Sequence, residues 1–168
     1  PINISFEGIG QKGFESEAVF IEAFFLLLNE EFTAHGNENL VTFLESSPIP
    51  DRMDKLGLWI KNLVKQTGKK IVLMIDEVDK SSNNQLFLDF LGMLRNKYLK
   101  RREPGQPTFH SVILAGVHDV RSLKAKIKKK DEEPKFNSPW NIAVDFKVDL
   151  SFSVNEIQSM LEDYSTEQ

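Results

Sequence analysis

One ten-residue stretch constrains the fold more than any other part of this chain. From Ile71 to Ile75 the sequence IVLMI is continuously apolar, and the acids Asp76, Glu77 and Asp79 follow at once. An apolar run without polar alternation is typical of a parallel strand that is covered on both faces. Ligands of such sheets bind beyond the carboxyl ends of the strands. The stretch therefore predicts an α/β fold with an acidic site at one edge of its sheet.

Strand and helix patterns alternate along the rest of the chain. Strand patterns occur at 2–7, 109–116 and 142–150, and apolar residues recur at helical spacing over 15–31, 39–45, 51–66, 84–101 and 153–164. Gly68 is a predicted helix stop, Ser81, Ser82 and Asn83 are predicted caps, and Ser153 and Glu156 stand in capping-box register. We predict a three-layer α/β domain over residues 1–150, with a mostly parallel sheet flanked by helices, followed by the start of a C-terminal helical region over 151–168.

Composition narrows the possible functions. The chain has 168 residues, 40% of them hydrophobic and 13 of them Phe, so we expect one domain with an aromatic core. It has no Cys, which excludes disulfides, zinc–thiolate sites and thiol catalysis. Apolar runs such as Ala23–Leu28 are too short to span a membrane, and Pro1–Gly8 does not read as a signal peptide, so we expect a cytoplasmic protein. The net charge of −4 argues against a dedicated nucleic-acid binder at the level of the whole chain.

The acids after the apolar run match the Walker B pattern of nucleoside triphosphatases. In that interpretation Asp76 holds Mg²⁺ through water and Glu77 polarises the attacking water. A hard cation requires oxygen ligands, and the base must stand one residue further along, facing the γ-phosphate. The alternative is an ordinary strand that ends in solvated acids.

Two further motifs lie near predicted strand ends. In VILAGVHD, His118 is the first candidate for a residue that senses the γ-phosphate, with Asp119 the second; alternatively, Asp119 caps a short helix. GIGQKG, which contains Gly8, Gly10 and Gly13, matches the G-x-G-x-x-G dinucleotide fingerprint. That fingerprint requires a second strand ending in an acid about 20 residues on. Because no such strand follows, we favour a loop.

A basic stretch is the remaining polar feature. Eleven of the 21 Lys and Arg residues lie between Arg95 and Lys130, opposed only by Glu103 and Asp119. It fits either a patch for nucleic acid or an acidic partner, or a solvated helix end and loop; we favour the second because no aromatic residues are interleaved. Arg101 and Arg102 are weak candidates for arginines that act on a neighbouring subunit. The three histidines have no spacing that would build a metal site.

Taken in order, three segments resemble a known family. IVLMIDEVDK, SVILAGVHDVRSLK and FNSPWNIAVDFKVDLSFSVNEIQSMLEDY are similar to bacterial AAA-like ATPase domains, close to the archaeal-type and STAND-like predicted ATPases of the ASCE division of P-loop proteins. Ser138–Ala143 (SPWNIA) resembles the short signature that precedes the last strand in that group. The resemblance covers essentially the whole chain. It implies ATP and Mg²⁺ as cofactors, Asp76 as metal ligand, Glu77 as catalytic base and His118 as sensor.

The chain departs from the family in one respect. No G-x-x-x-x-G-K-[ST] phosphate loop occurs, and the pair Gly68–Lys69 is followed by Lys70 and Ile71. The resemblance implies that the first strand and its P-loop lie upstream, with that strand beside 109–116. We expect weak nucleotide affinity in this chain alone, and a partner that is either this N-terminal segment or a second copy at the exposed sheet edge. The rival hypotheses are a non-enzymatic interaction module with the same fold and an NAD-binding domain.

Overall fold

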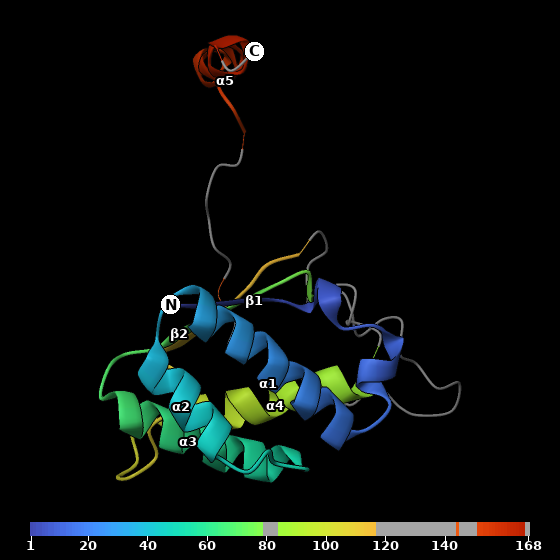
Figure 1. Cartoon of the computed structure of the whole chain (residues 1–168), viewed down its shortest axis with the longest axis vertical. Coiled ribbons are helices and arrows are strands. Elements are labelled where there is room, and N and C mark those ends of the chain that lie inside the picture. The colour runs from blue at the N-terminus through green and yellow to red at the C-terminus, as the bar shows by residue number, and fades with distance from the viewer. Residues whose placement is uncertain (79–83, 117–143, 145–150, 167–168) are drawn as a thin grey trace.

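The computed structural model describes residues 1–78, 84–116, 144 and 151–166 (Figure 1). Within them the chain forms an α/β arrangement. The elements in chain order are β1 (Ile2–Ser5), the 3₁₀ turns η1 (Phe6–Gly8) and η2 (Gln11–Phe14), α1 (Glu17–Ala34), α2 (Glu38–Ser46), α3 (Met53–Thr67), β2 (Val72–Asp76), α4 (Gln85–Lys100), β3 (Ser111–Leu114) and α5 (Val154–Thr166). The predicted strand at 142–150 lies outside the described residues.

The three strands form one parallel sheet in the order β1-β2-β3. Ile4 of β1 pairs with Ile75 of β2, which pairs with Leu114 of β3. The strand that carries the acidic motif is therefore central, as the apolar run predicted. Both of its neighbours end at the same edge of the sheet because all three strands run in one direction.

The helices α1 to α4 all lie on one face of this sheet (Figure 1). On that face Leu73 and Ile75 are at most 1% exposed, whereas Met74, which points to the opposite face, is 37% exposed. The strand order explains this difference. Connections between parallel strands are almost always right-handed, so two successive steps in the same direction place their helices on the same side. The described residues thus form two of the three layers that we predicted.

The core between the sheet and the helices is built largely from aromatic rings, as the phenylalanine content predicted. The ring of Phe90 on α4 lies 5.2 Å from that of Phe20 and 5.4 Å from that of Phe24, both on α1. Phe6, directly after β1, joins the same cluster. Tilted and edge-to-face pairs of this kind add to the free energy gained by burial. The fully buried phenylalanines are Phe6, Phe20, Phe24, Phe32, Phe87, Phe90 and Phe109.

The ends of the helices follow local sequence signals. Gly68 ends α3 with φ of +59°, a conformation that glycine adopts without steric cost, and this confirms the predicted stop. Asn84, and not one of the three residues before it, accepts the capping hydrogen bond at the start of α4. The predicted caps Ser81, Ser82 and Asn83 lie outside the described residues.

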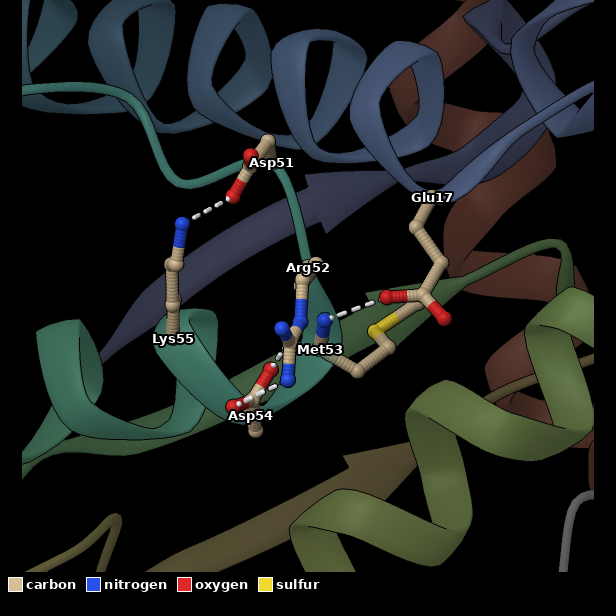
Figure 2. Close-up of polar contacts among 6 residues, drawn as sticks. All are labelled: Glu17, Asp51, Arg52, Met53, Asp54 and Lys55. Atoms are coloured by element: carbon tan, nitrogen blue, oxygen red, sulfur yellow. Dashed lines mark hydrogen bonds and ion pairs between the residues drawn. The ribbon is translucent and has the colours of Figure 1, made fainter.

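The start of α3 is held by side chains rather than by a cap of its own (Figure 2). The N–H of Met53 donates a 2.6 Å hydrogen bond to the carboxylate of Glu17, the first residue of α1. Arg52 binds Asp54 through two hydrogen bonds of 2.9 Å, and Lys55 binds Asp51 at 2.7 Å. The contact between Glu17 and Met53 places the first turns of α1 and α3 side by side.

The helix α5 stands apart from the rest of the described structure (Figure 1). The predicted capping box is confirmed: the N–H of Ser153 donates to Glu156 at 2.7 Å, and the N–H of Glu156 donates to Ser153 Oγ at 3.3 Å. Its apolar side chains, from Val154 to Tyr164, are exposed. None of the helices in the described ranges combines the length and apolar character that a membrane crossing needs.

Candidate functional site

Asp76 is the last residue of the central strand, at the carboxyl edge of the sheet, and its side chain is exposed. One of its carboxylate oxygens, Oδ1, accepts a 2.8 Å hydrogen bond from the N–H of Glu77. The other oxygen, Oδ2, has no hydrogen-bond partner among the described residues. A carboxylate that is oriented by one backbone N–H and open at its second oxygen suits a hard cation such as Mg²⁺.

Glu77 has an unusual backbone conformation. Its φ is +56°, the only positive φ among the described non-glycine residues. A side chain in this left-handed region costs about 1–2 kcal/mol, and such conformations concentrate at functional sites. The chain turns sharply after Asp76 as a result, and consecutive acids therefore do not alternate as they would in a strand. The Glu77 side chain is half-buried, whereas that of Asp76 is exposed.

The turn after β2 is tied to the carboxyl end of β3. The N–H of Ala115 donates to Ile75 at 2.9 Å, and the N–H of Val78 donates back to Ala115 at 3.1 Å. Ala115 therefore lies beside the acidic turn. The predicted sensor His118 and its alternative Asp119 follow Ala115 in sequence but lie outside the described residues, as does Ser138–Ala143.

Two surface hollows in the described part of the chain lie near the ends of the sheet. One of about 460 Å³ lies between β1 and α1 and includes Ser5, which pairs with Asp76 in the sheet. Asp76 does not line either hollow. The described residues also contain no group of three side chains able to hold a metal. A cation at Asp76 would therefore complete its coordination with water and phosphate oxygens, as Mg²⁺ commonly does.

The three glycines of the glycine-rich loop differ in how closely they pack against other residues. A Cβ atom added at Gly8 or Gly10 would meet nothing within 4 Å, whereas one added at Gly13 would collide with Ile9. The following helix is already capped, because Ser16 Oγ accepts the N–H of Val19 at 3.3 Å. This cap uses one of the N–H groups at the helix N-terminus, where the fingerprint would bind a pyrophosphate.

A second candidate site lies at the opposite, amino edge of the sheet. Its residues were not grouped together in the sequence analysis above. A hollow of about 430 Å³ is lined by Lys65 and Arg101, at the ends of α3 and α4, and by Lys69, Lys70 and His110, at the starts of β2 and β3. The basic stretch identified in the sequence begins at Arg95 and does not include residues 61–70. In that segment four lysines occur without a single acid, which is the signal that would have found the site.

Comparison with known proteins gives this chain no family: no family model matches its sequence, and no curated protein or solved structure matches it either.

Proposed function

We propose that the carboxyl edge of the sheet is the metal- and water-binding half of an AAA-like, P-loop-type ATPase centre. The observation that carries the proposal is the position of Asp76 and Glu77: an open carboxylate ends the central parallel strand, and a second acid follows it in a strained turn. Central strands of parallel sheets present their ligands at this edge.

In this proposal each acid has a distinct role. Asp76 would hold Mg²⁺, which would neutralise negative charge on the phosphates, and the hydrogen bond from the Glu77 N–H orients the Asp76 carboxylate. Bound Mg-ATP supplies the γ-phosphoryl group as the electrophile. Glu77 accepts a proton from the attacking water as its oxygen bonds to the γ-phosphorus and the bond to the bridging oxygen of ADP breaks. His118 keeps its predicted role as a sensor of the γ-phosphate.

The proposal requires a phosphate cradle from outside these 168 residues, because the chain has no G-x-x-x-x-G-K-[ST] string. The outer edge of β3, the place implied for the strand that carries this loop, pairs with no described strand. The 168-residue chain alone is therefore expected to hydrolyse little or no ATP. The gene sequence upstream of Pro1 is the first check: a phosphate-loop string there supports the ATPase, and its lack supports the non-enzymatic interaction module.

The decisive experiment uses the whole polypeptide that the gene encodes. Glu77→Gln should lower kcat for ATP hydrolysis by about 10²- to 10⁴-fold, the usual contribution of a general base, with little change in ATP affinity. Asp76→Asn should weaken the dependence on Mg²⁺ concentration. Glu22→Gln, an exposed acid on α1, is the matched control and should leave both unchanged. Equal kcat values for the Glu77 and Glu22 variants would overturn the assignment.

A further inference from the structure

We infer that the amino edge of the sheet carries a second site, which binds the phosphate backbone of a nucleic acid without regard to base sequence. This inference goes beyond the nucleotide centre proposed at the opposite edge and does not depend on it. The site is the hollow lined by Lys65, Lys69, Lys70 and Arg101, which we call the basic hollow.

The fold itself brings these cations together. Helices α3 and α4 run antiparallel to the strands, so both end where β2 and β3 begin. Lys65 lies in the last turn of α3, while Lys69 and Lys70 lie between the C-cap Gly68 and β2. Arg101 is the C-cap residue of α4, and His110 directly precedes β3. Segments about 35 residues apart in the sequence therefore contribute to one concave surface.

The segments that form this surface are rich in cations and poor in acids. The segments 61–70 and 95–110 contain nine Lys and Arg residues and one acid, Glu103, in a chain whose net charge is −4. The ion pairs found among the described residues involve other cations, namely His35, Arg52 and Lys55. The following side chains form no ion pair with a described residue: Lys61, Lys65, Lys69, Lys70, Lys97, Lys100 and Arg102.

The helix dipoles explain the positions of only some of these cations. The C-terminal end of a helix carries about half a negative elementary charge, and cations in the last turn are stabilised by it. Lys65, Lys97 and Lys100 occupy such positions. Lys69, Lys70 and Arg102 lie beyond the helix ends, so the two dipoles leave a net positive field. A hollow with apolar walls, here Val64 and the buried Phe109, strengthens such a field at its mouth.

Shape and chemistry favour a polymer of phosphates over a single nucleotide. The cations continue from the hollow along α3 and α4, where Lys61 and Lys100 both repel Lys97. No exposed Phe, Tyr or Trp side chain lines the hollow to stack on a base, because Phe109 is buried. Arg101 is held in place: its guanidinium lies 3.5 Å from the ring centre of Tyr98 and donates to the Tyr98 carbonyl at 2.6 Å. Contacts to phosphates alone give affinity without sequence readout.

The test is a salt titration with the 168-residue chain and a fluorescein-labelled 20-base-pair DNA duplex, followed by fluorescence anisotropy. Four cations at the hollow predict a slope of log K against log salt of about −4. The double variant Lys69→Gln, Lys70→Gln should reduce the magnitude of this slope by about two, equally for two unrelated sequences. A second pair that lines the hollow, Lys65→Gln with Arg101→Gln, should give a similar reduction.

The matched control removes two charges elsewhere. Lys12→Gln with Lys55→Gln changes the net charge equally, and both lysines are exposed outside the basic hollow. This pair should leave the slope unchanged, and circular dichroism should show that every variant is folded. Three results would overturn the inference: no duplex binding at 50 mM salt, an equal loss of slope in the control pair, or binding of inorganic triphosphate without binding of the duplex.

Discussion

The charged side chains near the two edges of the sheet have different neighbours. At the start of α3, beside the first turn of α1, cations are matched with acids, and the hydrogen bond from Lys55 lowers the pKa of Asp51. At the ends of α3 and α4 the cations face one another. There, burial and the neighbouring charges of Lys61 and Lys100 lower the pKa of Lys97. Acids at helix starts and cations at helix ends are what helix dipoles favour, but at the second edge Lys65, Lys69 and Lys70 form no ion pair with a described residue.

This difference separates charges that are paired within the fold from charges that a bound ligand would have to neutralise. A matched pair such as Arg52–Asp54 stabilises the fold locally and needs no ligand. A group of like charges costs free energy in the folded state, and a bound polyanion removes that cost. At the carboxyl edge the unexplained cost is instead the backbone strain at Glu77. The three predictions below test whether the edges share one core, and how large each of these costs is.

The largest effect should come from the core that both edges share. Phe90→Ala removes a buried ring in contact with Phe6, Phe20 and Phe24 and should lower the free energy of unfolding by about 3–5 kcal/mol. Urea denaturation measures this loss, and Leu26→Ala, at an exposed position, should change it by less than about 0.5 kcal/mol. Hydrogen exchange should show both edges losing protection together. Loss at one edge alone would mean that the two edges unfold as separate units.

A smaller difference in stability, between two variants at position 77, is expected at the carboxyl edge. At position 77, glycine adopts the left-handed conformation freely and alanine does not, while both lack the glutamate carboxylate. Glu77→Gly should therefore be more stable than Glu77→Ala by about 1 kcal/mol. Thermal denaturation of both variants measures the difference.

The comparison has an internal control on α1. At Glu22, an exposed helical position, the order should reverse, with glycine about 1 kcal/mol less stable than alanine. If alanine were also the more stable residue at position 77, the turn after Asp76 would not store strain. The acidic edge would then lose the feature that separates it from an ordinary strand end.

The two edges also show which features of the fold and of the sites can be predicted from the sequence. The apolar run before Asp76 identified the central strand, and the apolar periodicity located the four helices that cover it, because both signals are local. The four lysines of 61–70 are a local signal too, but the sequence does not show that 65–70 and 101–110 line one hollow, because a parallel crossover brings them together. The strain at Glu77 had no signal either, because nothing in the pair Asp-Glu reports a left-handed φ. The expected third layer depended on elements outside the described residues.

The smallest effect should appear at the amino edge, in Lys97→Met. The methionine keeps an apolar stem against Gly57 of α3 but removes one of three mutually repelling charges. Relief of like-charge repulsion on this scale is worth about 0.2–0.5 kcal/mol, so the variant should be slightly more stable at neutral pH and low salt. Urea denaturation in 20 mM and 500 mM salt measures the gain, which screening should reduce.

The pH dependence of the same variant gives a second, independent readout. Because the pKa of Lys97 in the folded chain lies below the ordinary lysine value, the unfolded chain binds more protons between the two values. Stability of the wild type should therefore rise with pH through that alkaline window, and Lys97→Met should lose this contribution to the rise. Lys55→Met, which breaks the pair with Asp51, should instead lower stability at neutral pH. If both substitutions lowered it, the charge at the ends of α3 and α4 would be as well matched as that at the start of α3, and no polyanion would be needed to explain it.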